Sequence, residues 1–322
     1  MIYKLAQNRV SRTYGGGRNI DFFAGEIFKG KGFYPEDWTA STVSAISQDG
    51  KTEGYGMTTD GKSVRDIVGE DGLPILVKLL DAGERLAVQV HPTAEFATEN
   101  LGSRFGKTEC WYMLGCDEDA CVYLGFRKGV TKELWKEAIM GGDSKRILSM
   151  LCRIPVRKGD FVFVGGGIVH AIGKGCFLAE LQEPSDLMTV AETKTESGRD
   201  IPSFRLDMGL GLDKALDMYD YTGFSEDELR GKYVFRPDTV KNGVTSVCTK
   251  ELTDKFSMAI LNGNARYNPE RRCAVAIVIS GEGKLCGRRA ARGERFLIVG
   301  DKDSENCIRT EGDEAFSVIL CE

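Results

Sequence analysis

Apolar and polar residues alternate along several short stretches of the chain, a pattern typical of β-strands that bury one face. One stretch reads Leu-Ala-Val-Gln-Val-His and ends at His91. Side chains two positions apart share a face of a strand, so Gln89 and His91 would lie about 7 Å apart on one face. The other face would carry Leu86, Val88 and Val90. The pattern therefore predicts a strand that presents an amide and an imidazole together.

Neighbouring stretches predict further strands with polar residues on one face. Residues 74–80 are apolar except for Lys78, and the stretch that begins at Lys107 places Glu109 and Trp111 on the same face. Strand-like runs recur in the last third of the chain. Because 39 glycines outnumber 8 prolines, we expect many turns made with glycine. These features predict a mainly β protein.

Helical spacing is limited to a few places, of which about 131–152 is the clearest. Thr131 is a favourable N-cap residue, apolar residues follow at intervals of three and four, and two glycines end the helix. Asp143 could cap a second short helix. Residues 193–235 are polar and less regular, so we interpret them as a connection between domains.

The length of 322 residues suggests about two domains at roughly 150 residues each. A weak internal repeat supports this division, because residues 157–164 and 291–299 both read as a basic residue, a glycine, an acidic residue and an apolar strand. We therefore expect a first domain, 1–235, that carries the short helices, and a smaller β domain, 236–322.

Charge and cysteine usage narrow the expected partners and compartment. A net charge of -5 argues against nucleic acid or an anionic membrane as the main partner, but local cations could still bind a small phosphorylated ligand. No apolar run reaches the roughly 18 residues that span a bilayer. The ten cysteines form no Cys-x-x-Cys pair, so we expect reduced thiols in a cytoplasmic protein rather than a disulfide framework. The sequence leaves homo-oligomerisation open.

The chain contains only two histidines, and both accompany predicted strands. An apolar run, three glycines, His170 and a second apolar run follow one another, which is how a small antiparallel barrel presents an imidazole to its interior. With Gln89, His91 and Glu109 it would form a mixed nitrogen and oxygen site that suits Zn²⁺ and could also hold Mn²⁺, Fe²⁺, Co²⁺ or Ni²⁺. The alternative is two core histidines with satisfied hydrogen bonds. The matched strand positions favour the metal site.

Several motifs resemble those of known enzymes. The glycine-rich stretch that ends at His170 is similar to the second metal motif of the cupin superfamily, G-x5-P-x-G-x2-H, with Gly165 in place of the proline. Val-Gln-Val-His-Pro around His91, Gly-Lys-Thr-Glu-Cys-Trp-Tyr around Glu109 and Val-His-Ala-Ile-Gly around His170 resemble type I mannose-6-phosphate isomerases in their short bacterial form. The resemblance covers about residues 14–190, and the C-terminal unit only by pattern.

This resemblance implies a fold, a reaction and roles for individual residues. The fold would be two cupin-type jelly-roll barrels, with a few helices inserted in or flanking the first and no metal ligands in the second. The reaction would be a metal-dependent aldose–ketose isomerisation of mannose 6-phosphate and fructose 6-phosphate through a cis-enediol. The implied residues are Gln89, His91, Glu109 and His170 for zinc, Lys107, Glu180 and Asp186 for catalysis, and Lys78 and Trp111 for substrate binding. The plainer alternatives are a solvated surface charge for Asp186 and a buried ion pair for Lys78.

Two positions depart from the family pattern. The family carries an arginine where this chain has Val190, and a serine where it has Ala87. Lys194, Arg199 or Arg205 could supply the missing cation. The departures leave two alternatives open, an isomerase of another sugar or phosphosugar on the same scaffold and a non-catalytic sugar-binding or regulatory cupin.

Overall fold

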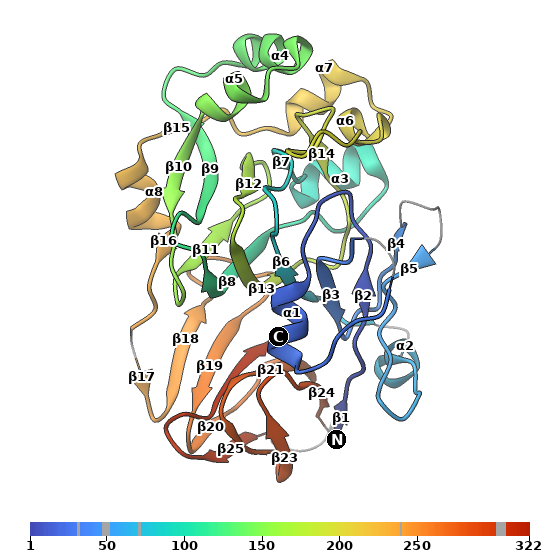
Figure 1. Cartoon of the computed structure of the whole chain (residues 1–322), viewed down its shortest axis with the longest axis vertical. Coiled ribbons are helices and arrows are strands. Elements are labelled where there is room, and N and C mark those ends of the chain that lie inside the picture. Colours follow the sequence, from blue (N-terminus) through green and yellow to red (C-terminus); the bar gives the residue numbers. More distant parts are fainter. Residues whose placement is uncertain (31–32, 47–51, 70–71, 239, 301–306) are drawn as a thin grey trace.

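The protein is built from stacked antiparallel sheets, with short helices at one end (Figure 1). The computed structural model describes residues 1–322 except 31–32, 47–51, 70–71, 239 and 301–306. Within the described residues four larger sheets are present, which we number I to IV in the order in which they pack. The mainly β class predicted from the sequence is confirmed.

In Figure 1, sheet I lies in the upper half of the molecule and sheet II across its middle. Sheet I contains, in spatial order, β10 (Leu151–Pro155), β9 (Cys121–Arg127), β12 (His170–Ile172), β7 (Gln89–Val90) and β14 (Thr189–Val190), with β15 (Gly223–Phe224) beside β9. Sheet II contains β16 (Val234–Phe235), β11 (Phe161–Val164), β8 (Glu109–Cys116), β13 (Cys176–Gln182), β6 (Leu76–Asp81), β3 (Glu36–Thr39) and β2 (Arg9–Val10). A separate strand pair joins β4 (Ala45–Ile46) to β5 (Thr52–Glu53).

Sheets III and IV come mostly from the C-terminal third of the chain. Sheet III contains β1 (Ile2–Lys4), β24 (Arg295–Val299), β21 (Cys273–Ser280), β26 (Ser317–Cys321), β19 (Met258–Asn262), β18 (Val244–Cys248) and β17 (Val240–Lys241). Sheet IV contains β20 (Ala265–Tyr267), β25 (Ile308–Gly312), β22 (Glu282–Leu285) and β23 (Arg288–Ala291). The N-terminal strand β1 pairs with β24, so the chain begins in the sheet that its C-terminal third completes.

Apolar side chains fill each space between neighbouring sheets. Along β8, Cys110 and Tyr112 pack toward sheet III, whereas Trp111 and Met113 pack toward sheet I, as the period of two in a strand requires. Sheets III and IV share a further apolar core around Phe296. Sheet II is therefore covered on both faces, by sheet I on one and by sheet III on the other.

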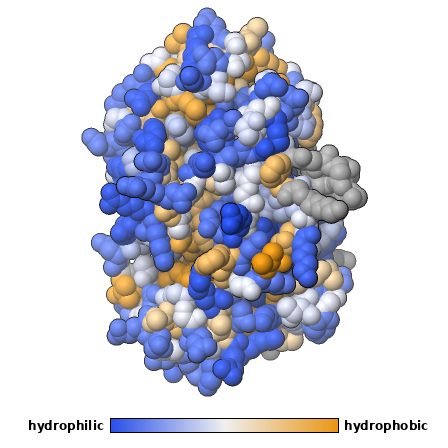
Figure 2. Space-filling model, in the orientation of Figure 1, coloured by the Kyte–Doolittle hydropathy of each residue, from blue (hydrophilic) through white to orange (hydrophobic). Residues whose placement is uncertain are grey.

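Short helices cover the outer face of sheet I and the edges of the molecule. Their bounds are α1 (Arg18–Ala24), α2 (Val64–Val68), α3 (Ala94–Leu101), α4 (Lys132–Gly141), α5 (Ser144–Ser149), α6 (Phe204–Asp207), α7 (Leu212–Ala215) and α8 (Glu226–Lys232), and a 3₁₀ turn spans Leu216–Met218. Trp135 of α4 and Ile147 of α5 pack on Val88, Val90 and other residues of sheet I. On the face drawn in Figure 2, hydrophilic residues predominate and apolar ones are scattered among them.

The predicted helices are confirmed with their caps. Thr131 and Asp143 accept hydrogen bonds from the first turns of α4 and α5, and Gly142 ends α4 in a left-handed conformation. The predicted helical region to residue 152 is too long, because residues 151 and 152 already belong to β10. Residues 193–235, interpreted as a connection between domains, form α6, α7 and α8 and bury Leu216 and Leu229.

One strand is shorter than the alternation predicts. Ladder hydrogen bonds define only Gln89–Val90 as β7, and Leu86 lies in the core between sheets I and II rather than with Val88 and Val90. The strict period of two holds only where the backbone is a regular strand. The division at residue 235 and the arrangement as two jelly-roll barrels stay predictions.

The ten cysteines are all free thiols. Among the described helices, none has the length and apolarity needed to cross a membrane.

The packing of sheet III on sheet II can be tested with one core substitution. Ile277 of β21 is fully buried between them, so Ile277→Ala should lower the free energy of unfolding by about 2–5 kcal/mol through lost burial and a residual cavity. Val240→Ala, at an exposed position, should change it by less than about 0.5 kcal/mol. Urea denaturation measures both, and equal effects of the two variants would contradict this packing.

Candidate metal centre and substrate pocket

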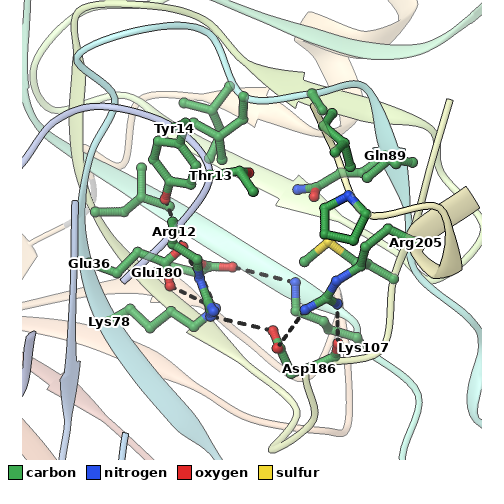
Figure 3. Close-up of a pocket in the computed structure, with 18 of the residues that line it drawn as sticks. Arg12, Thr13, Tyr14, Glu36, Lys78, Gln89, Lys107, Glu180, Asp186 and Arg205 are labelled. Carbon is green, nitrogen blue, oxygen red and sulfur yellow. Dashed lines mark hydrogen bonds and ion pairs between the residues drawn. The ribbon is translucent and has the colours of Figure 1, made fainter. Parts of the chain in front are cut away.

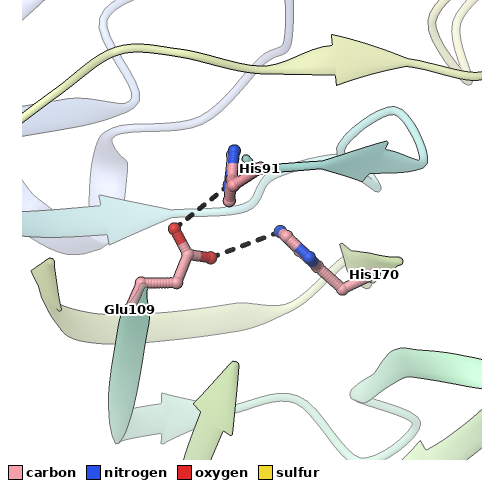
Figure 4. Close-up of side chains that lie close together, drawn as sticks. All are labelled: His91, Glu109 and His170. Atoms are coloured by element: carbon pink, nitrogen blue, oxygen red, sulfur yellow. Dashed lines mark ion pairs between the residues drawn. The ribbon is translucent and has the colours of Figure 1, made fainter. Parts of the chain in front are cut away.

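Three of the four predicted metal ligands meet between sheets I and II (Figure 4). One ligand atom from each of His91, Glu109 and His170 lies within 4.8 Å of the other two. The Nε2 atom of His91 lies 3.2 Å from one carboxylate oxygen of Glu109, and the Nε2 atom of His170 lies 3.3 Å from the other. All three side chains are almost completely buried. The carboxylate thus stands between two imidazoles with its oxygens directed at them.

Strand pairing places these side chains. His170 opens β12 and pairs with Gln89 of β7, and His91 follows β7 directly, so three of the predicted ligands come from two neighbouring strands of sheet I. Glu109 opens β8 in sheet II and faces them. The amide nitrogen of Gln89 lies 3.2 Å from His170 Nε2, which brings the fourth predicted ligand to the same point.

Backbone carbonyls fix the orientation of both imidazoles. The Nδ1 atom of His91 lies 2.9 Å from the carbonyl oxygen of Leu187, and that of His170 lies 2.9 Å from the carbonyl oxygen of Ile168. A carbonyl oxygen can only accept, so each Nδ1 must carry the proton and donate it. Each Nε2 lone pair is therefore directed at the cluster, the arrangement found for histidines that bind metals.

The ammonium group of Lys107 contacts two of the predicted ligands, His91 and Glu109. The ammonium nitrogen of Lys107 lies 2.6 Å from His91 Nε2 and 2.7 Å from a carboxylate oxygen of Glu109. The amide oxygen and nitrogen of Gln89 exchange places by a rotation of its side chain, which would direct the oxygen at the cluster. Two imidazole nitrogens, a carboxylate and an amide oxygen fit a divalent transition metal, with zinc best suited to this donor set.

The protonation states agree with a ligand role. Burial, together with the charge of Lys107, lowers the pKa of His91 to about 3, so this imidazole is neutral at physiological pH. Burial alone would raise the pKa of Glu109, but Lys107 and the two histidines hold it well below its usual range. A neutral imidazole and an ionised carboxylate are the forms that bind metals.

A pocket of about 330 Å³ opens beside this cluster (Figure 3). Gln89 and Glu109 form part of its wall, and so do four residues predicted to act on substrate: Lys78, Lys107, Glu180 and Asp186. The structure does not support Trp111 as a substrate-binding residue. It is fully buried in the core between sheets I and II, its ring lies 5.5 Å from that of His170, and it does not line the pocket. Trp111 does share a strand face with Glu109, but the strand extends past the cavity into the core, so its side chain packs there.

Adjacent strands of sheet II place charged residues side by side in the pocket. Glu180 of β13 pairs in register with Lys78 of β6, and the Lys78 ammonium lies 3.6 Å from the Glu180 carboxylate and 3.8 Å from that of Glu36 on β3. Burial is the main cause that raises the pKa of Glu180, to about 8. The buried ion pair considered for Lys78 is present, but at the surface of a cavity.

Two arginines hold Asp186 at the edge of the pocket. Its carboxylate lies 3.5 Å from Arg12 and 3.4 Å from Arg205 of α6. Burial alone would raise the pKa of Asp186, but the two guanidinium groups keep it below its usual value. Asp186 is therefore not a solvated surface charge.

Arg205 is the one of three candidate replacement cations that reaches the pocket. Val190 and Ala87, at the two positions that depart from the family pattern, both line it. Arg199 instead pairs with Glu84 and donates to the carbonyl of Thr13, and Lys194 pairs with Asp200 in an exposed position. 

Sequence reasoning missed several residues of the pocket. Arg12, Tyr14 and Glu36 line it, and the Tyr14 hydroxyl donates to Glu36 at 2.7 Å. The only local signal was the run of glycines after Tyr14, which marks a turn. Nothing in the alternation of residues 1–60 shows that this turn folds over the cavity.

Two proteins of Bacillus subtilis are similar to this chain in sequence. The protein of Bacillus subtilis called probable mannose-6-phosphate isomerase GmuF is 30% identical over 282 residues, which are 85% of this chain and 84% of that protein. The chain belongs to the mannose-6-phosphate isomerase family. Mannose-6-phosphate isomerase ManA of the same organism is 29% identical over 244 residues, 75% of this chain and 73% of the relative. No protein-family model matches the chain.

Solved structures of mannose-6-phosphate isomerases share the fold. The crystal structure of the Bacillus subtilis enzyme has a TM-score of 0.75 at 22% identity and covers 100% of this chain and 99% of its own. A mannose 6-phosphate isomerase crystallised with zinc and yttrium has a TM-score of 0.70 at 14% identity, with 99% and 98% covered. The resemblance to this family expected from the sequence is confirmed.

Metal retention tests the ligand cluster directly. His91→Ala removes one of two imidazoles that share Glu109, so zinc should bind more than about 10-fold more weakly, since changing even a hydrogen-bonding partner of a ligand has that effect. Metal content after dialysis against a weak chelator measures it. Cys286→Ser, at an exposed thiol, serves as the control and should keep its zinc. Full zinc content in His91→Ala would contradict the site.

Proposed function

We propose that this chain is a metal-dependent aldose–ketose isomerase that interconverts mannose 6-phosphate and fructose 6-phosphate. Its family supports the reaction. The observation that carries the proposal is the position of the metal-ligand cluster, because Gln89 and Glu109 line the same pocket as Lys78, Lys107 and Glu180. A bound sugar would therefore meet a metal, two ammonium groups and a carboxylate within one cavity.

The metal would be held by Gln89, His91, Glu109 and His170, with Zn²⁺ as the first choice and Mn²⁺, Fe²⁺, Co²⁺ or Ni²⁺ as alternatives. When bound, such an ion polarises the hydroxyl and carbonyl oxygens of a sugar. The carbonyls of Ile168 and Leu187 keep the imidazole protons on Nδ1. They thereby hold both Nε2 atoms ready as ligands.

The reaction moves one proton from C2 to C1 of the open-chain sugar and one from O2 to O1, through a cis-enediol. We assign the carbon-bound proton to Glu180, whose carboxylate is the pocket acid placed between two lysines, 3.6 Å from the Lys78 ammonium and 3.9 Å from that of Lys107. Negative charge that develops on the enediol oxygens would lie next to these ammonium groups. Both ammonium groups are buried, and Lys78 is already held between Glu36 and Glu180, so it needs little rearrangement as the reaction proceeds.

Several expectations remain at the level of prediction. A role for Asp186 in ring opening or proton transfer stays a prediction, and so do a cytoplasmic location and the oligomeric state. A sugar phosphate is the expected partner. The family supports it, and the pocket offers guanidinium and ammonium donors that suit phosphate oxygens.

A coupled assay tests the reaction. Zinc-loaded protein should convert mannose 6-phosphate into fructose 6-phosphate, and removal of the metal with a chelator should abolish turnover, which added zinc should restore. Retained zinc with no turnover on any hexose 6-phosphate would instead favour a sugar-binding protein. Turnover on a different hexose 6-phosphate alone would favour another isomerase on the same scaffold.

Glu180→Gln tests the proton carrier. The amide keeps the shape of the side chain but cannot accept the carbon-bound proton, so kcat should fall by about 10²- to 10⁴-fold. Glu118→Gln, at an exposed position, is the matched control and should leave kcat unchanged. Bound zinc should stay at the wild-type level in both variants, and a normal kcat in Glu180→Gln would exclude this role.

A further inference from the structure

Among the described residues, four cations line the pocket, and three of them are engaged. Arg12 donates to Glu36 at 2.9 Å and lies over the ring of Trp38. Lys78 lies between the carboxylates of Glu36 and Glu180. Lys107 contacts the metal-ligand cluster. These three side chains hold the pocket wall together, since each contacts a carboxylate that is almost completely buried.

Arg205 pairs with the most exposed carboxylate of the pocket, since the side chain of Asp186 is 15% exposed and those of Glu36, Glu109 and Glu180 are 5% or less. Its side chain meets Asp186 at 3.4 Å, both at the carboxylate and at the backbone carbonyl, which is longer than the 2.7–2.9 Å typical of a charge-assisted hydrogen bond. Asp186 is at the same time held by Arg12. The carboxylate therefore keeps an ionic partner if the guanidinium of Arg205 turns to a ligand.

Position along the pocket also sets Arg205 apart. The side chain of Lys107, beside the metal ligands, is 2% exposed and that of Lys78 is 4% exposed, whereas that of Arg205 is 19% exposed. Arg205 belongs to α6, in the polar segment that follows sheet I, and its guanidinium lies over the half-exposed ring of Phe204. Figure 3 shows it entering the pocket from the side opposite Lys78 and Glu36.

The shape of the substrate fits these positions. In a hexose 6-phosphate the reacting carbons C1 and C2 are at one end and the phosphoryl group is at the other. If C1 and C2 lie at the buried metal cluster, the phosphoryl group points toward the more exposed part of the cavity. A guanidinium offers a planar pair of N–H donors that matches two phosphate oxygens.

We propose that Arg205 binds the phosphoryl group of the substrate and that Asp186 is the positioning residue that holds it toward the pocket. This inference rests on the proposed isomerase function. It assigns to α6 a part in substrate recognition and selects Arg205 from the three cations that the sequence left open.

The test uses zinc-loaded protein and ligands that cannot react. Mannitol 6-phosphate and mannitol have no carbonyl group, so they occupy the pocket without isomerising. Calorimetric titration with mannitol 6-phosphate, mannitol and inorganic phosphate separates the phosphoryl contribution from that of the sugar. The variants are Arg205→Gln, Arg205→Lys and, as a control from the same polar segment, Lys194→Gln, whose side chain lies outside the pocket.

Arg205→Gln should weaken binding of mannitol 6-phosphate and of inorganic phosphate by roughly 10- to 100-fold, the loss expected for a charged hydrogen-bond donor. Its affinity for mannitol should match that of the wild type. Arg205→Lys should recover part of the loss, because lysine keeps the positive charge but lacks the planar pair of N–H donors. In the assay, Arg205→Gln should raise KM with little change in kcat, and Lys194→Gln should behave as the wild type.

Three results would overturn the proposal. These are an unchanged affinity of Arg205→Gln for mannitol 6-phosphate, an equal loss for mannitol and mannitol 6-phosphate, and a fall in kcat at constant KM, which would place Arg205 at the reacting carbons. Failure of the isomerase function itself is distinguishable. It would appear in the zinc-loaded wild type as no conversion of mannose 6-phosphate, whatever the behaviour of the variants.

Discussion

Two imidazoles and a carboxylate meet at one point because the register of two facing sheets brings them there. His170 pairs with Gln89 in sheet I, and Glu109 begins the strand of sheet II that faces them. A slip of one residue in either sheet would turn these side chains to the opposite face. Backbone carbonyls then lock both rings, so the cluster is fixed by main-chain geometry rather than by flexible side chains.

The pocket around this cluster concentrates charge in a place where unpaired charge would be costly. Each acid in it has at least one cationic neighbour, as with Glu36 beside Arg12 and Lys78, and Asp186 beside Arg12 and Arg205. Apolar cores on both sides of sheet II provide the stability that such a site does not. A divalent ion and a phosphorylated sugar would add charges of opposite sign to this arrangement.

Local sequence pattern was enough to find the residues that stand on regular strands. Glu109 comes from a long strand of sheet II, where a period of two assigns each side chain to a face. Lys78 and Glu180, which also stand on long strands of this sheet, were implied by the family resemblance. The two histidines could be found because they are the only ones in the chain and occupy matched positions. The same period failed for Leu86, where the ladder stops, and for Trp111, where the right face lies beyond the cavity.

Residues on irregular segments could not be found in this way. Arg12 and Tyr14 reach the pocket from the N-terminal turn, and Arg205, one of three cations that the sequence left open, reaches it from a helix of one turn. Their positions depend on how distant segments pack over sheets I and II. No periodicity within a segment of a few residues carries that information.

X-ray absorption spectroscopy at the zinc edge of the zinc-loaded protein tests the metal centre most directly. Four ligands from an amide, a carboxylate and two imidazoles predict a first shell of nitrogen and oxygen at about 2.0–2.2 Å, with the outer-shell scattering of imidazole rings. With ten free thiols in the chain, binding elsewhere would introduce sulfur at about 2.3 Å. A first shell that contains sulfur, or one without imidazole scattering, would contradict the centre described here.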